Sequence, residues 1–166
     1  MEYTLDNISL DFGKITEEIL RVVDEVKQRG LPEAFISNQG GTQIHQDVWS
    51  KVLTPESYIE STVIPTILNH VNGTNSHWWL NVNYPQCYNN PHLHGEPGNP
   101  KKEFSGVYYV KVPEESGDLV FPMTESFISP APGDLVTFSA DVLHGVEPNF
   151  SDDIRISLAF NFFPKK

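Results

Sequence analysis

Three histidines have the residue type and spacing of a metal site. His92 and His94 lie two residues apart in the segment NPHLHGE, residues 90–96, and His144 follows further along the chain in DVLHGV. In an extended segment, residues i and i+2 project from the same face, so both imidazoles can reach one point. Three neutral nitrogen donors leave the opposite positions of an octahedral metal open for substrate and dioxygen. His-x-His alone is a weak signal, and two exposed loop histidines are the alternative.

Arg155 is a second residue whose type suggests a functional role. It lies in the run RISLAFNFF, which is expected to be the last long strand. Arg155, Ser157 and Ala159 share one face of that strand, and the other face is apolar. A buried Arg is costly unless an anion meets it. Its planar fork suits a carboxylate held bidentately, with the Ser157 hydroxyl as a second donor. The alternative is an exposed Arg that pairs with Asp152 or Asp153.

Two helices are expected in the first part of the chain. Apolar residues from Ile15 to Val26 recur with helical spacing, and Gly30 should end that helix. A second helix should start near Thr54, as N-cap, and run to about residue 73. Pro65 lies inside this span and should kink or divide the helix.

From Trp78 onward the pattern changes to strands. WWLNVNY, FSGVYYVKV, GDLVFPM, GDLVTFS and RISLAFNFF are short runs rich in Val, Phe, Tyr and Leu, separated by turn residues. Such runs without intervening helices indicate an antiparallel sandwich or barrel. The expected fold is mainly β with N-terminal helices, a jelly roll in one domain over residues 1–166. Residues 1–73 would form a helical support region and residues 76–164 the jelly-roll core.

Composition limits the classes of function. The 166 residues can bury one core, and the formal net charge of -11 argues against a broad nucleic-acid surface or binding to an anionic membrane. The lone Cys87 excludes an internal disulfide. No signal peptide and no membrane-length apolar run are visible, so we expect a cytoplasmic protein.

The order of these motifs resembles the 2-oxoglutarate/Fe(II) oxygenase superfamily. His-x-(Asp, Glu or His), a distal His, and then Arg-x-Ser some ten residues later is its pattern. NVNYPQCYNNPHLHGE, EFSGVYYVKVP, PGDLVTFSADVLHGVEPN and RISLAFNF look like the small Fe(II) oxygenases of bacteria and phages, over roughly residues 37–164. The resemblance implies a double-stranded β-helix that uses Fe(II), 2-oxoglutarate and O2 to hydroxylate a substrate, releasing succinate and CO2, with ascorbate as a candidate stimulant.

The resemblance also implies roles for individual residues. His92 and His144 match iron ligands, and Arg155 matches the residue that binds the far carboxylate of 2-oxoglutarate, with Ser157 as its companion. Tyr109 matches a tyrosine that donates to the same carboxylate. Further pocket candidates on the strand before His92 are Asn83 and Tyr84. For Tyr109 and Tyr84, ordinary strand packing is the alternative.

The second ligand departs from the family pattern. Most members have a carboxylate where this chain has His94. In one register the iron binds His92, His94 and His144; in the other, His94 and Glu96 bind it and His92 lies outside. The Pro91-His92 context favours the first register. A three-histidine site has one negative charge fewer, which should alter the iron potential and its grip on an anion.

Two other interpretations of the histidine pattern remain open. A cupin-type metal-binding jelly roll would keep the histidines without needing Arg155, and a catalytically degenerate binding module would explain the missing carboxylate. His45 is interpreted as a surface residue that could line a substrate entrance, His70 as a residue at the end of the second helix, and His77 as a residue at a strand start. The loop of residues 95–103 should cover the site mouth. The substrate is not identified, and a homodimer is a hypothesis, since dimers are common in such folds.

Overall fold

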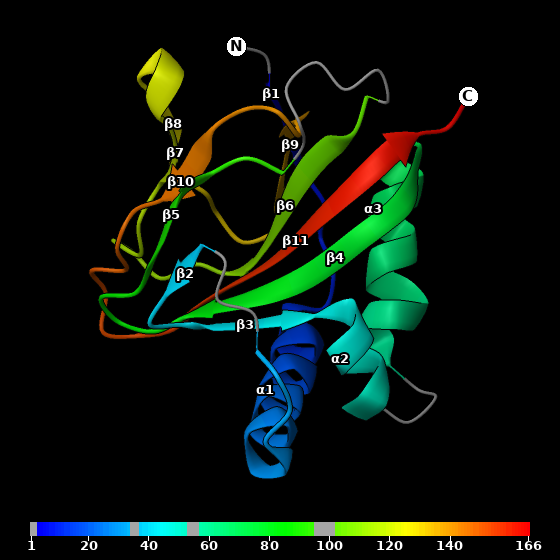
Figure 1. Ribbon diagram of the computed structural model, residues 1–166, viewed down its shortest axis with the longest axis vertical. Helices are drawn as coiled ribbons and strands as arrows, with labels where there is room; N and C mark the ends of the chain where they lie inside the picture. Colours follow the sequence, from blue (N-terminus) through cyan, green and yellow to red (C-terminus); the bar gives the residue numbers. More distant parts are fainter. Residues whose placement is uncertain (1–2, 34–36, 53–56, 95–101) are drawn as a thin grey trace.

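The computed structural model describes residues 3–33, 37–52, 57–94 and 102–166, with Ser76 described by its backbone only (Figure 1). The helical elements are α1 (Phe12–Arg29), α2 (Gln46–Val52), a π-helix (Ile59–Val63), α3 (Ile64–His70) and a 3-10 helix (Pro122–Thr124). The strands are β1 (Tyr3–Asn7), β2 (Asn38–Gln39), β3 (Thr42–His45), β4 (Gly73–Asn83), β5 (Tyr88–His92), β6 (Phe104–Lys111), β7 (Leu119–Phe121), β8 (Ser126–Ile128), β9 (Asp134–Ser139), β10 (His144–Val146) and β11 (Arg155–Pro164).

The strands form two antiparallel sheets. The larger sheet has the order β1-β9-β6-β11-β4-β3, and the smaller has the order β2-β5-β10-β7-β8. Figure 1 shows the helices α1, α2 and α3 on the side of the larger sheet that faces away from the smaller one. This is the expected jelly roll, a double-stranded β-helix with N-terminal helices. No helix in the described part of the chain is long and apolar enough to span a membrane.

Strict alternation along the larger sheet separates a packing face from a cavity face. In β11, Ile156, Leu158 and Phe160 belong to the core beneath the helices. Arg155 and Ser157, on the other face, line a cavity between the two sheets. The same alternation holds in β4 and β6, because successive side chains of a strand point to opposite faces. One surface of the sheet therefore stabilises the fold while the other is free to carry chemistry.

The helices form as the sequence predicts. Asp11 caps α1 by accepting a hydrogen bond from the backbone N–H of Lys14, and Gly30 ends the helix in a left-handed conformation. The apolar stripe of α1 is buried against the sheet. Pro65 divides the second helix as expected, since a π-helix ends at Val63 and α3 begins at Ile64 with Pro65 in its first turn. The predicted N-cap, Thr54, lies outside the described residues.

The first 73 residues are not only helical. They also contribute β1, β2 and β3, which lie at edges of the two sheets, and the short helix α2. All residues of β1 are exposed, so this strand has no apolar alternation to reveal it. The smallest of these strands, β2, has two residues. Short polar edge strands are formed by pairing with a neighbour, which local sequence does not encode.

Candidate active site

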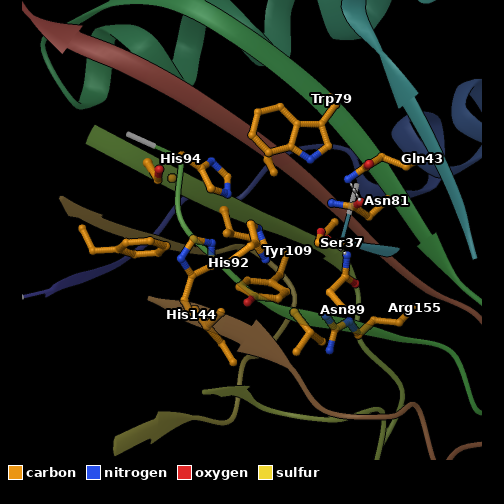
Figure 2. Close-up of a pocket in the computed structure, with 18 residues that line it drawn as sticks. Ser37, Gln43, Trp79, Asn81, Asn89, His92, His94, Tyr109, His144 and Arg155 are labelled. Carbon is orange, nitrogen blue, oxygen red and sulfur yellow. Dashed lines mark hydrogen bonds between the residues drawn. The ribbon is translucent and has the colours of Figure 1, made fainter. Parts of the chain in front are cut away.

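The three predicted metal-binding histidines come together at one end of the cavity. Strands β5 and β10 pair with His92 directly opposite His144. His94 follows two residues after His92, and its backbone N–H donates to the carbonyl of Ala140 at 2.9 Å. Each histidine offers one nitrogen, and these nitrogens all lie within 4.8 Å of one another. Figure 2 shows the three rings grouped on one side of the cavity.

The hydrogen bonds of the imidazoles leave the right nitrogen available for a metal. The Nδ1–H of His92 donates to the carbonyl of Asn90 at 2.7 Å, and the Nδ1–H of His144 donates to the carbonyl of Val142 at 2.8 Å. The Nδ1–H of His94 donates to the side-chain oxygen of an asparagine on β11 at 2.9 Å. Because a carbonyl oxygen can only accept, each neutral ring keeps its lone pair on Nε2. This donor set fits a metal ion.

Burial keeps these rings uncharged. Desolvation lowers the pKa of His144 to about 3, with a further lowering from nearby His92. Desolvation also lowers the pKa of His94 to about 4, although its hydrogen bond to Asn161 acts in the opposite direction. The pKa of His92 is lowered for the same main reason. Neutral imidazole is the form that binds a metal.

This pattern of shifts predicts acid destabilisation of the metal-free protein. A histidine in an unfolded chain titrates near pH 6.5, so between there and about pH 4 the unfolded chain binds more protons than the folded one. The free energy of unfolding should therefore fall as the pH falls, by up to about 1.4 kcal/mol per pH unit for each histidine. Urea denaturation at about pH 6.5 and pH 5 measures the slope, and His94→Phe should reduce it. An unchanged slope in that variant would contradict the assignment.

His94 has its own support in the larger sheet. The side-chain oxygen of Asn161, on β11, accepts from His94 Nδ1–H and from the hydroxyl of Ser105 at 3.0 Å. This support was not predicted, although Asn161 lies on the same strand face as Arg155. The grouping of His92 with His94 and His144 supports the three-histidine register. Glu96, the alternative ligand, lies outside the described residues, as does most of the loop expected at residues 95–103.

We predict that Asn161→Leu weakens metal binding by about 10- to 100-fold, as is usual when a partner that orients a ligating histidine is lost. Asn161→Asp should retain most of the affinity because a carboxylate oxygen can accept the same bond. Titration of the metal-free protein with Co(II), followed by visible absorbance, measures the change. Equal affinity in Asn161→Leu and the unmodified protein would mean that His94 is not a ligand.

The opposite end of the cavity contains a buried cation. Arg155 is 3% exposed, and its guanidinium donates to the carbonyls of Ser116 and Gly117 at 3.3 and 3.0 Å. Among the described residues it forms no ion pair, and Asp153 pairs instead with Lys111 at 2.9 Å. The alternative of an exposed Arg155 paired with Asp152 or Asp153 is therefore wrong. Desolvation lowers the pKa of Arg155, although the guanidinium stays charged at neutral pH.

Tyr109 lies between the two ends of the cavity (Figure 2). Tyr109 is fully buried, and its ring centroid lies 5.9 Å from the guanidinium carbon of Arg155. Among the described residues, its hydroxyl has no hydrogen-bond partner. Burial raises the pKa of Tyr109 to about 12, so the hydroxyl is a proton donor. A buried donor without a partner is costly, and an anion beside Arg155 would satisfy it. Ser157 lines the same cavity.

The inner cavity is narrow. Its volume is about 30 Å³, which holds roughly two water molecules. The charge and the hydrogen-bond donors at this end of the cavity are complementary to a carboxylate group. The bonds from Arg155 to Ser116 and Gly117 go to neutral carbonyls. A carboxylate would replace them with stronger, charge-assisted bonds.

Two predicted pocket residues have other roles. Asn83 is buried beside the cavity, where its amide donates to Asn89 at 3.0 Å and accepts from Asn38 at 3.3 Å. Tyr84 packs with the core beneath the helices, and its hydroxyl accepts from Lys27 at 3.1 Å. Tyr84 thus occupies the packing position that was the alternative to a pocket role.

Sequence reasoning missed a polar wall of the cavity. Gln43 on β3 donates to Asn81 on β4 at 2.9 Å, and Asn89 on β5 donates to Ser37 at 3.2 Å. Figure 2 shows these four side chains together, across the cavity from the histidines. Asn81 lies two residues after Trp79 on the inward face of β4, so alternation could have indicated it; Gln43 gave no such signal because its strand was not predicted.

Comparison with solved structures places the fold. No protein-family model matches the sequence, and no curated protein matches it. A prolyl 4-hydroxylase from Pseudomonas putida is 15% identical and superimposes with a TM-score of 0.68, over 99% of this chain and 93% of that one. The viral collagen prolyl hydroxylase vCPH from Paramecium Bursaria Chlorella virus-1, in complex with 2-oxoglutarate, is 17% identical with a TM-score of 0.62, over 97% and 96%.

A third neighbour carries both a metal and the co-substrate. HygX from Streptomyces hygroscopicus, with nickel and 2-oxoglutarate bound, is 9% identical with a TM-score of 0.56, over 98% of this chain and 83% of that one. At these identities the likeness establishes the fold. The chain is thus a double-stranded β-helix protein with the fold of the 2-oxoglutarate/Fe(II)-dependent oxygenases, and it carries a histidine triad able to hold a metal ion.

Proposed function

We propose that the protein is an Fe(II)- and 2-oxoglutarate-dependent oxygenase of the hydroxylase type, with a three-histidine iron site. The observation that carries this proposal is one cavity with three converging neutral imidazoles at one end. At the other end is a buried guanidinium that forms no ion pair with any described residue. When bound, the iron and 2-oxoglutarate supply the oxidising chemistry, consuming O2 and releasing succinate and CO2. The residues of the chain provide binding, orientation and exclusion of water.

At the metal end, His92, His94 and His144 would hold the iron through Nε2. Their Nδ1–H bonds prevent the rings from rotating and keep the lone pairs directed at one point. Three neutral ligands add no negative charge, so the anionic co-substrate meets less repulsion than it would beside a carboxylate ligand. This charge difference favours retention of 2-oxoglutarate at the site.

At the other end, Arg155 would bind the far carboxylate of 2-oxoglutarate, and the hydroxyls of Tyr109 and Ser157 would donate to it. Each of these groups lines the inner cavity. A cupin-type metal protein does not require a buried cation at this position, and burying a cation without an anionic partner costs free energy. The unpaired Arg155 and the unpaired Tyr109 hydroxyl thus favour the oxygenase over the cupin reading.

Anaerobic addition of 2-oxoglutarate to the Fe(II)-loaded protein tests the proposal. A visible charge-transfer band should develop, and admission of O2 with ascorbate should give succinate, measured by mass spectrometry. Metal binding without the band would favour the cupin reading. The band without succinate, with or without candidate substrates, would favour a degenerate binding module.

A further inference from the structure

An outer cavity adjoins the histidine triad, and Arg155 is not among its described lining residues. Its volume is about 210 Å³, and its wall includes His92 and His94 together with Gln43, His45, His77 and Trp79. An engineered cavity of roughly 150 Å³ binds benzene, so this one admits a group of about that size or slightly larger. Both His45, which was expected on the surface or at a substrate entrance, and His77 line this cavity.

The strand register explains how His45 reaches the cavity. In the pairing of β3 with β4, Gln43 lies opposite Asn81 and His45 lies opposite Trp79, all on the inward face. The His45 ring stacks on Trp79 with centroids 5.7 Å apart, and its Nδ1 shares a hydrogen bond with Nε2 of His77. His77 therefore fixes the orientation of His45.

Two polar atoms in this wall have no partner among the described residues. They are Nε2 of His45 and the side-chain oxygen of Gln43, a residue that is 3% exposed. If His45 donates to His77, its Nε2 is an acceptor; if His77 donates, the same Nε2 carries the proton and is a donor. A ligand group that can both donate and accept a hydrogen bond matches either tautomer of His45. The side-chain oxygen of Gln43 can only accept, so it needs a donor on the ligand. Buried polar atoms of this kind normally have partners.

The described residues lining the outer cavity include no Asp, Glu, Lys or Arg. Desolvation and the neighbouring His77 lower the pKa of His45, while Asp47 raises it less. A charged ligand group here would lose its hydration without meeting an opposite charge from the described lining residues, which is costly. The inner cavity is different, because Arg155 supplies a positive charge there.

We propose that the outer cavity is the substrate subsite and that it selects an uncharged group able to donate and accept hydrogen bonds, an amide or a hydroxyl. The identification of the bound group as the substrate rests on the proposed function, whereas the selectivity of the cavity does not. His45, positioned by His77, and Gln43 hold the group, and the ring of Trp79 packs beside it. The carbon to be oxidised would then lie next to a neutral amide or alcohol, and not next to a carboxylate or an amine.

Four probes of equal ring size test this selectivity on the metal-free protein: benzamide, benzyl alcohol, benzoate and benzylamine. Binding is followed by the NMR shift of the indole N–H of Trp79. Benzamide and benzyl alcohol should bind and shift this signal, and their order of affinity separates the amide from the hydroxyl. Benzoate and benzylamine, which are charged at neutral pH, should bind at least about fivefold more weakly, the effect of about one hydrogen bond.

Variants of His45 and Gln43 test whether their unpartnered polar atoms bind the probes. His45→Phe keeps a ring on Trp79 but removes both nitrogens, and should weaken the neutral probes by about fivefold to tenfold. Gln43→Met should do the same. His70→Phe is the matched control, because His70 is half-exposed at the end of α3 and pairs with Asp6. Native-like denaturation curves and amide spectra establish that each variant is folded.

The proposal would be overturned if a charged probe bound as tightly as benzamide, if no probe bound, or if the folded His45→Phe and Gln43→Met bound the neutral probes unchanged. The measurement needs no iron, O2 or 2-oxoglutarate. Loss of the proposed oxygenase activity would therefore leave it intact, and a negative probe result would not affect the test of 2-oxoglutarate binding.

Discussion

Arg155→Ala is expected to abolish 2-oxoglutarate-dependent succinate formation and to weaken 2-oxoglutarate binding by about 30-fold or more, while metal binding is retained. Removing one partner of a buried, hydrogen-bonded charge pair typically costs 2–5 kcal/mol. Arg155 is the cation at the inner end of the cavity, and its guanidinium donates hydrogen bonds to two backbone carbonyls. Calorimetric titration of the Ni(II)-loaded protein with 2-oxoglutarate measures the loss without turnover.

Two further variants define this result. Arg155→Lys keeps the charge but not the planar fork, and should recover part of the affinity. Lys111 is a cation near Arg155 that pairs with Asp153 outside the cavity. Lys111→Ala should therefore leave 2-oxoglutarate binding unchanged. If folded Arg155→Ala bound 2-oxoglutarate as tightly as the unmodified protein, the assignment of the inner cavity would be wrong.

His144→Ala should lower metal affinity by more than about 100-fold, beyond the range typical of losing an outer hydrogen-bond partner. His144 is the most buried of the three histidines, and its lone pair points to the shared site opposite His92. A three-ligand site that loses one ligand keeps only two donors, which rarely hold a divalent ion at micromolar levels. Co(II) titration of the metal-free protein measures the affinity.

Because the ring of His144 also packs against Phe138, with centroids 4.6 Å apart, its removal could lower stability as well as metal affinity. His92→Ala is therefore the companion variant, since its ring is only half-buried. It should lose metal to a similar extent. His70→Ala, remote from the site, should bind metal normally. Metal affinity within tenfold of the unmodified protein in both ligand variants would contradict the triad.

Residues within one element were predictable from sequence. The burial of Arg155, Ser157 and Ala159 on the face of β11 opposite Ile156 follows from a period of two residues, which depends only on backbone geometry. The end of α1 at Gly30 and the division at Pro65 likewise follow from the local conformational limits of Gly and Pro. The five strands predicted from Trp78 onward were also confirmed, because strand periodicity likewise depends on a few neighbouring residues.

Relations between elements required the tertiary structure. A register shift in the pairing of β5 with β10 allows Asn89 and His92, three residues apart, both to line the cavity, which strict alternation does not allow. The His94–Asn161 bond joins residues 67 positions apart. Which buried polar atoms lack a partner, among them the Tyr109 hydroxyl, depends on every neighbouring strand.

By itself, then, the sequence determined the residue types of the site, the faces on which they lie and the class of fold, because helix and strand periodicity act over a few residues. Only the tertiary structure decided that Tyr84 packs in the core beneath the helices and that Asn161 supports His94. It also decided that His45 and Gln43 line a second cavity, whose described lining includes no charged residue. Those outcomes depend on strand pairing and register between distant segments, and such pairing is settled by the packing of the whole chain.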